Sequence, residues 1–251
     1  MPIRKNADRQ LTKGVITPDI QQAIQNNLHS FTSLQEGVRD AQLVVEAATE
    51  NKQVKLDIFK QLDDCTSPGS ILATNTSSIS ITAIAAATQR PEKVIGMHFM
   101  NPVPVMKLVE IINGYSTSKE VTETIVALSK QLEKTPCVVN DYPGFIANRI
   151  LMPMINEAIY SLYEGIAGVT EIDTIMKQGM AHPMGPLQLA DFIGLDVCLS
   201  ILKTLQEGFG NPKYAPCPLL TNMVAAGKLG VKTGEGFYRY TPGTKELVPA
   251  R

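Results

Sequence analysis

Four polar side chains between residues 73 and 110 have the types and spacing of a proton-transfer site. Asn75 and Ser77 belong to a polar NTSS run, His98 lies near the end of the apolar run VIGMHF, and Glu110 follows twelve residues later. A carboxylate beside an imidazole fixes the tautomer of the ring and stabilises its charged form. A histidine paired in this way can take the proton of an alcohol and return it. The sequence therefore predicts an acid–base pair with a hydroxyl and an amide nearby.

Each of these residues also has a structural interpretation that requires no chemistry. A histidine near a strand end is more often a satisfied core or edge residue, and a lone Glu110 would be a solvated edge carboxylate. The NTSS run is also the usual cap of a following helix. Asn148, an isolated polar residue on a long apolar helix, needs a hydrogen-bond partner. That partner is either a core group or a substrate reached from the second half of the chain.

Short apolar runs place these residues at one edge of a sheet. We expect strands over residues 71–74 (ILAT) and 94–99 (VIGMHF), and a strand over 107–112 (KLVEII) that returns from the proline-flanked turn at 101–104. Ligands bind at the carboxyl ends of the strands in open α/β sheets. Ser77 follows the first of these strands, so it is expected to face the same pocket as the histidine.

The first 140 residues alternate helical and extended patterns, which is typical of an α/β domain with a parallel sheet. We expect this sheet to have a hairpin-like edge. The remaining elements expected are an amphipathic helix over 4–28 broken at Gly14, a strand over 41–49 buried on both faces, helices over 52–64, after Ser80 and over 118–133, and a strand over 137–140.

The pattern changes at residue 141, after which the chain is predicted to be all-helical. The apolar run 145–164 contains Pro153, which should kink a helix, and further helices are expected over 170–179, 186–207 and 219–228. Helices that are apolar on all sides need to be covered. A domain of this size has limited internal volume, so we expect a homodimer formed through this half.

Composition excludes several classes of protein. The 251 residues are 44% hydrophobic and 19% charged, with a formal net charge of -1, which gives no electrostatic signature of nucleic-acid or anionic-membrane binding. No apolar run approaches the length needed to span a bilayer. The cysteines form no CxxC pair and no cluster with histidine, so we expect no metal site, no disulfide framework and a reducing, cytoplasmic location. They are Cys65, Cys137, Cys198 and Cys217.

Six longer motifs resemble the L-3-hydroxyacyl-CoA dehydrogenases, most closely the bacterial 3-hydroxybutyryl-CoA dehydrogenases. They are LVVEAATEN, ILATNTSSISI, KVIGMHFMNPVPVMKLVEII, PGFIANRILMPMINEAI, AHPMGPLQLADFIGLDVCL and KLGVKTGEGFYRY, in this order over nearly the whole chain. The resemblance implies an incomplete Rossmann-type NAD-binding domain over 1–140 and a helical domain for substrate binding and dimerisation over 141–251. It also implies hydride transfer between NAD and C3 of a short-chain 3-hydroxyacyl-CoA thioester.

The resemblance assigns roles to individual residues. His98 would be the general acid or base and Glu110 its orienting partner, while Ser77 and Asn148 would bond the substrate 3-oxygen. The residues expected to line the NAD site are Glu50, Lys55, Asn75, Ser77, Asn101 and Lys232.

The chain also departs from the family pattern. Such enzymes begin with a strand, a glycine-rich GxGxMG turn and a helix, but no GxGxxG occurs in these 251 residues. About 40 residues of the pattern have no counterpart, comparable to a β-α-β unit of 30 or more residues. Two alternatives therefore stay open. One is a non-catalytic, structural protein like lens lambda-crystallin, and the other is a gulonate 3-dehydrogenase.

Overall fold

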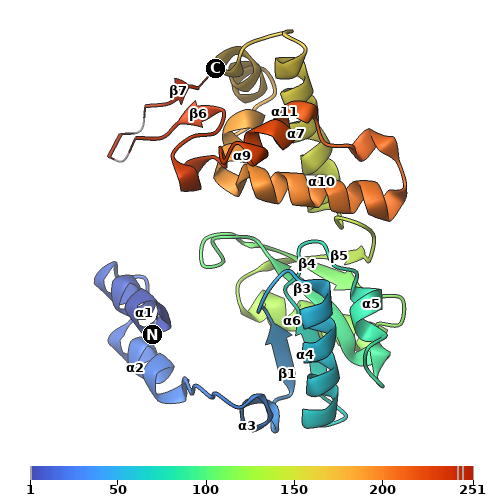
Figure 1. The fold of residues 1–251 in the computed structure, drawn as a ribbon. Helices are drawn as coiled ribbons and strands as arrows, with labels where there is room; N and C mark the ends of the chain where they lie inside the picture. Colours follow the sequence, from blue (N-terminus) through green and yellow to red (C-terminus); the bar gives the residue numbers. More distant parts are fainter. Residues whose placement is uncertain (1, 242, 245, 251) are drawn as a thin grey trace.

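The computed structural model describes residues 2–241, 243–244 and 246–250. A sheet with helices on both faces forms one part of the molecule, and a group of helices from the second half of the chain lies over one edge of that sheet (Figure 1). Within the described residues, none of the helices combines the length and the apolar character that crossing a membrane requires. The predicted fold class, an α/β domain followed by a helical domain, is therefore confirmed.

The sheet has five strands in the order β1-β2-β3-β4-β5. They are β1 (Leu43–Glu46), β2 (Ile71–Thr74), β3 (Val94–Phe99), β4 (Leu108–Asn113) and β5 (Thr135–Asn140). Strands β1, β2 and β3 are parallel, β4 is antiparallel to β3, and β5 is parallel to β4. The antiparallel pair was expected at the edge of the sheet, which is wrong, because β5 adds a further strand beyond β4.

Helices cover the two faces of the sheet. On one face, Phe59 and Leu62 of α4 (Lys52–Cys65) and Ile81 of α5 (Ile81–Ala85) pack against Leu72 and other strand residues. On the other face, Val121 and Ile125 of α6 (Lys119–Gln131) pack against Ala73, Ile95 and Ile111. The alternating side chains of β1 to β4 thus enter two separate cores, as expected for a sheet buried between helices.

The first strand is less buried than its sequence suggested. The apolar run 41–49 predicted a strand buried on both faces, but Val45 of β1 is 42% exposed and Leu43 and Val44 are half-buried. The reason is position: β1 pairs only with β2 among the described strands, so it forms an edge of the sheet. On the face that carries α6, Leu43 packs only partly buried against the core that Val121 and Ile125 of α6 help to form.

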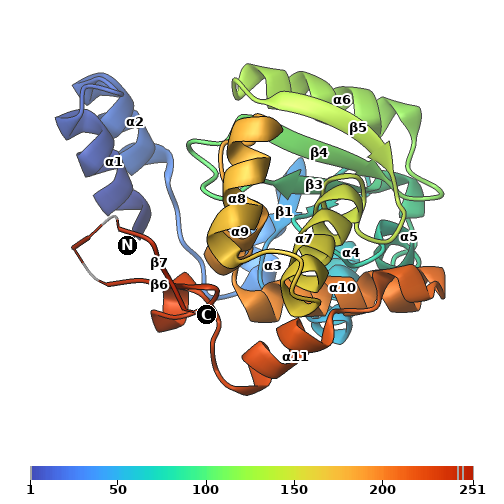
Figure 2. The same cartoon turned by 90° about the horizontal axis from the view of Figure 1, so that it is seen from above.

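The chain before β1 forms two helices that pack on each other, α1 (Pro2–Thr12) and α2 (Pro18–Asn27), and the short α3 (Leu34–Val38). The predicted break at Gly14 is confirmed, since this residue has a φ of 66°, which a glycine adopts without strain. The pair α1 and α2 lies to one side of the sheet in two perpendicular views (Figures 1 and 2).

The second half consists of helices around a separate apolar core. They are α7 (Ala147–Tyr163), α8 (Val169–Thr174) with a π-helical turn (Ile175–Gly179), α9 (Pro186–Ile193), α10 (Leu195–Phe209) and α11 (Pro218–Ala225), followed by the short strands β6 (Tyr238–Arg239) and β7 (Val248–Pro249). Short 3₁₀ turns occur at Pro91–Lys93, Pro212–Tyr214 and Val231–Thr233. The single helix predicted over 186–207 is wrong, because Gly194, with a φ of 102°, divides it into α9 and α10.

Two buried carboxylates, Asp173 and Asp191, hold the end of the chain against this core, a feature that the sequence did not predict. Asp173 accepts a hydrogen bond from the hydroxyl of Tyr238 at 2.8 Å. Asp191 accepts hydrogen bonds from the backbone N–H groups of Phe237 and Tyr238, at 3.0 and 2.9 Å, and from the hydroxyl of Tyr240 at 3.0 Å. Burial raises the pKa of Asp191 despite these donors. The tail segment therefore belongs to the helical domain.

Candidate active site

Ser77, His98 and Glu110 form one chain of hydrogen bonds at the edge of the sheet. His98 on β3 and Glu110 on β4 are directly opposite in the antiparallel register. The Oε2 atom of Glu110 lies 2.8 Å from Nδ1 of His98, and the Oγ atom of Ser77 lies 3.1 Å from its Nε2. Directly opposed residues of an antiparallel pair have side chains within reach of each other. The predicted strand-turn-strand arrangement thus explains why the carboxylate and the imidazole meet.

The second carboxylate oxygen of Glu110 binds the start of the helical domain. Its Oε1 accepts hydrogen bonds from the backbone N–H groups of Ile146, at 3.2 Å, and Ala147, at 3.0 Å. Only 3% of Glu110 is exposed. Burial raises its pKa, but the hydrogen bonds from His98 and from these N–H groups lower it by more, so the pKa lies below the ordinary value. Glu110 is therefore ionised at neutral pH.

The charge on Glu110 determines the tautomer of the imidazole. A carboxylate only accepts hydrogen bonds, so Nδ1 of His98 must carry the proton that lies between them. In the neutral ring, Nε2 then has a free lone pair and accepts a hydrogen bond from the hydroxyl of Ser77. This arrangement leaves a basic nitrogen directed at the edge of the sheet, where a substrate hydroxyl could take the place of the serine hydroxyl.

Asn148 connects the helical domain to the same group. It lies in the first turn of α7, is 8% exposed, and donates a hydrogen bond from Nδ2 to the backbone carbonyl of Ser77 at 3.1 Å. The partner that a buried amide requires is thus found in the other domain. Four of the predicted site residues, those assigned to catalysis, are brought together.

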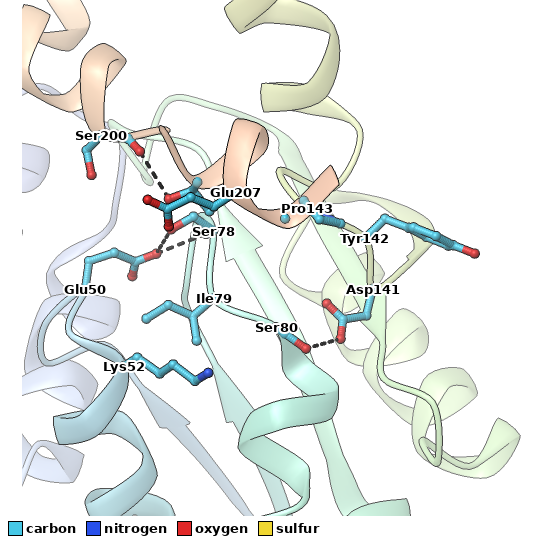
Figure 3. Close-up of a pocket in the computed structure, with 12 residues that line it drawn as sticks. Glu50, Lys52, Ser78, Ile79, Ser80, Asp141, Tyr142, Pro143, Ser200 and Glu207 are labelled. Carbon is cyan, nitrogen blue, oxygen red and sulfur yellow. Dashed lines mark hydrogen bonds between the residues drawn. The ribbon is translucent and has the colours of Figure 1, made fainter. Parts of the chain in front are cut away.

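Glu50 lies beside this group and binds the NTSS loop. Its Oε1 atom accepts hydrogen bonds from the hydroxyls of Thr76 and Ser78, at 2.7 and 2.9 Å, and from the N–H groups of Ser77 and Ser78, at 2.9 and 3.0 Å. Figure 3 shows Glu50 directed at Ser78 across the floor of a cleft. The carboxylate therefore connects the loop between β1 and α4 to the loop that follows β2.

Lys55 is buried beneath Glu50. Its ammonium forms a 2.6 Å ion pair with Glu46 and lies 4.0 Å from Oε2 of Glu50, with 1% of the side chain exposed. Thr74 also donates a hydrogen bond to Glu46, at 2.7 Å. Burial raises the pKa of Glu46, but the bonds from Lys55, the Ala48 N–H and Thr74 together hold it below its ordinary value. Lys55 and Glu46 therefore form a buried ion pair beneath Glu50 and the NTSS loop.

The other residues predicted to bind a cofactor lie apart from one another. Asn75 accepts a hydrogen bond from the Phe99 N–H at 2.9 Å, which ties β2 to the end of β3. Asn101 is exposed in the loop after β3, at a cis peptide bond with Pro102. Lys232, in the helical domain, donates a hydrogen bond to Asp196 at 2.6 Å.

A cleft of about 680 Å³ lies next to the Ser77 loop, between the sheet edge and α10 (Figure 3). Its walls carry hydroxyl and carboxylate groups from both domains. They include Glu50, Ser78, Ser80, Asp141, Ser200, Thr204 and Glu207. Among the residues that the structure describes, no three His, Cys, Asp or Glu side chains are grouped to hold a metal ion.

Comparisons with known proteins identify the family of this chain. The family model described as 3-hydroxyacyl-CoA dehydrogenase, NAD binding domain, matches residues 2–142, and the C-terminal domain of the same family matches residues 144–240. A probable 3-hydroxybutyryl-CoA dehydrogenase of Deinococcus radiodurans is 55% identical over 238 residues, which are 95% of this chain and 85% of the relative. A 3-hydroxybutyryl-CoA dehydrogenase of Bradyrhizobium diazoefficiens is 51% identical over 99% of this chain and 84% of the relative.

A solved structure gives the same result for the fold. The crystal structure of (S)-3-hydroxybutyryl-CoA dehydrogenase from Ralstonia eutropha matches with a TM-score of 0.92 and 48% identity, over 96% of this chain and 84% of that one. The resemblance found in the six sequence motifs is thus confirmed over both domains. The chain belongs to the 3-hydroxyacyl-CoA dehydrogenase family.

Proposed function

We propose that this protein interconverts a short-chain 3-hydroxyacyl-CoA and the corresponding 3-oxoacyl-CoA, with NAD as the hydride carrier. The observation that carries the proposal is the hydrogen-bond chain from Ser77 through His98 to Glu110, at 3.1 and 2.8 Å. The Nε2 atom of His98, which now accepts from the Ser77 hydroxyl, is the acceptor that an alcohol needs when its carbon loses a hydride. The named relatives act on 3-hydroxybutyryl-CoA by their descriptions, which favours a short acyl chain.

The proton moves through His98 in both directions. During oxidation, Nε2 takes the hydroxyl proton, C3 loses a hydride, and the C3–oxygen bond becomes a carbonyl. The imidazolium formed is stabilised by the ionised Glu110, which already holds the opposite ring nitrogen. During reduction, the imidazolium returns its proton to the 3-oxygen. Ser77, whose hydroxyl lies 3.1 Å from Nε2, and Asn148, which binds the Ser77 carbonyl, are proposed to donate hydrogen bonds to negative charge developing on that oxygen.

The residues present fit one end of NAD. NAD supplies the hydride acceptor when bound, and the carboxyl ends of β2 and β3 offer hydroxyl and amide groups, from Ser77 and Asn101, that suit a nicotinamide carboxamide and its ribose. Lys55, Asn75 and Lys232 remain proposed members of this site, whereas Glu50, which was also expected here, binds the loop that carries Ser77. The usual cradle for a pyrophosphate is a GxGxxG turn, which the 251 residues lack, so we assign no pyrophosphate contact.

We also propose that the two domains have different roles. Residues 1–140 carry the proton relay and bind the cofactor, and residues 141–251 complete the acyl-CoA site and form a homodimer. Exposed apolar residues support the dimer: Ile166, Ile175 and Met180 are 71, 58 and 61% exposed. An apolar groove of about 370 Å³ lies beside the first two. We propose a cytoplasmic location, because all four cysteines are free thiols.

Acetoacetyl-CoA reduction tests the proposed function. The purified 251-residue protein is mixed with NADH and acetoacetyl-CoA, and NADH absorbance is followed, with L-gulonate and NAD in a parallel assay. Turnover of the CoA ester is expected. Turnover of L-gulonate alone would support the sugar-acid alternative, and absence of both turnover and NADH binding would contradict the proposal in favour of a structural protein.

A further inference from the structure

We propose that Glu50 is a positioning residue, which holds the Ser77 loop in the one arrangement that lets the serine hydroxyl reach His98. The proposal rests on the proposed function, and it differs from the expectation that Glu50 serves the cofactor. The side chain comes from the loop between β1 and α4, while its partners lie 26 to 28 residues later in the loop after β2.

The contacts of Glu50 are concentrated on one oxygen atom. Oε1 accepts four hydrogen bonds, all at 3.0 Å or less, from the Thr76 hydroxyl, the Ser77 N–H, and both the N–H and the hydroxyl of Ser78. Hydrogen bonds to an ionised acceptor are about twice as strong as neutral ones. Since the Oε1 atom already accepts four hydrogen bonds from the protein, its role is to hold the loop from Thr76 to Ser78.

A rigid layer supports Glu50 from below. Oε2 of Glu50 lies 4.0 Å from the ammonium of Lys55, which is itself fixed by Glu46 at 2.6 Å. Lys55 and Glu46, with 1% and 3% of their side chains exposed, are both out of reach of water and hold each other in place. The position of Glu50 is therefore set by the sheet and α4, and the loop takes its position from Glu50.

Ser77 is consequently held on three sides. Its N–H donates to Glu50, its carbonyl accepts from Asn148, and its hydroxyl contacts His98. Without Glu50, two N–H groups and two hydroxyls of the loop lose their acceptor and must form hydrogen bonds with water instead. The Ser77 hydroxyl then loses its hydrogen bond to Nε2 of His98. A displacement of about 1 Å can cost on the order of 100-fold in rate.

A double-mutant cycle tests whether Glu50 acts through Ser77. We expect Glu50→Ala to lower kcat by about 10- to 100-fold, with less than a threefold change in KM for NADH. Combined with Ser77→Ala, it should add almost nothing, because the serine hydroxyl that it positions is already absent. Multiplicative effects, or a loss confined to KM for NADH, would overturn the proposal in favour of independent cofactor binding.

Two variants control the cycle. Glu50→Gln keeps an oxygen acceptor for the Ser77 and Ser78 N–H groups, so it should retain most of the activity lost in Glu50→Ala. If Gln is as slow as Ala, accepting these hydrogen bonds is not what Glu50 contributes, and the proposal would be overturned. Glu123→Gln removes an exposed carboxylate of α6 and should leave kcat unchanged.

Amide hydrogen exchange provides a test that needs no turnover. In the native protein, the N–H groups of Ser77 and Ser78 should exchange slowly, and Glu50→Ala should speed their exchange at least tenfold while leaving peptides from α6 and α10 unaffected. Unchanged exchange in the loop would refute the proposal. If the native protein is inactive but the loop exchanges as expected, the proposed function fails while the positioning role stands.

Discussion

Replacing Glu110 with glutamine tests the reasoning behind the acid–base pair, because the two side chains have the same shape and differ in what their ends donate. The carboxylate accepts from Nδ1 of His98 through one oxygen and from the N–H groups of Ile146 and Ala147 through the other. A glutamine has one accepting oxygen and one donating NH₂ group. It can therefore satisfy only one side of the site.

The two orientations of the glutamine have different costs. With its oxygen toward His98, the NH₂ group faces two buried N–H donors, and each unsatisfied donor costs about 1–3 kcal/mol. With its oxygen toward those N–H groups, the NH₂ group faces Nδ1, and His98 must move its proton to Nε2. The second orientation keeps more hydrogen bonds, so we expect it to prevail, with a stability loss of about 1–3 kcal/mol.

That orientation removes the base. A proton on Nε2 leaves no lone pair to accept the substrate proton, so Glu110→Gln should lower kcat by about 10²- to 10⁴-fold. The measurements are steady-state reduction of acetoacetyl-CoA and oxidation of 3-hydroxybutyryl-CoA, together with urea unfolding. A variant with kcat within threefold of the native value and unchanged stability would show that Glu110 neither fixes the tautomer nor holds α7.

Three further substitutions follow from the same geometry. His98→Gln should cut turnover by about 100-fold or more with CoA-ester binding intact; unchanged turnover would refute its role. Asn148→Ala leaves the Ser77 carbonyl without its donor. It should lower stability by about 1–3 kcal/mol and also lower kcat. Urea unfolding and steady-state kinetics, measured on the same variant, would reveal an effect on kcat alone. Because the pKa of Glu46 is lowered from 4.5, its contribution to stability is complete above pH about 4.5 and is lost as the pH falls further. Glu46→Gln leaves the buried Lys55 with only the more distant Glu50, at 4.0 Å, as a charged partner, and should cost about 3 kcal/mol at neutral pH. The urea midpoint should also depend less on acid pH, and an unaltered acid dependence would contradict the assignment.

The sequence predicted the parts of the site that depend on strand patterns. His98 and Glu110 could be paired because an apolar run, a proline-flanked turn and a second apolar run define an antiparallel register. Ser77 could be placed because polar residues directly follow a buried strand. These inferences needed only local patterns and the rule that strand ends share one edge.

Other parts depend on contacts that no local pattern encodes. The bonds from Glu50 to the NTSS loop join segments 26 to 28 residues apart through a side-chain rotamer. The exposed face of Val45 depends on which strand lies at the sheet edge. The break at Gly194 was missed because the apolar pattern continues across it, and only the backbone reveals the positive φ.

The interface between the domains and the proton relay share the same hydrogen bonds. Glu110 binds His98 with one oxygen and the start of α7 with the other, while Asn148 of α7 binds the carbonyl of Ser77. Removing α7 from the sheet would leave a buried carboxylate with two fewer donors, which would raise its pKa toward the ordinary value. The tautomer of His98 would then be less firmly fixed. Because buried polar groups need all their partners, the basic nitrogen at the sheet edge depends on the packing of the helical domain as much as on the strands that carry it.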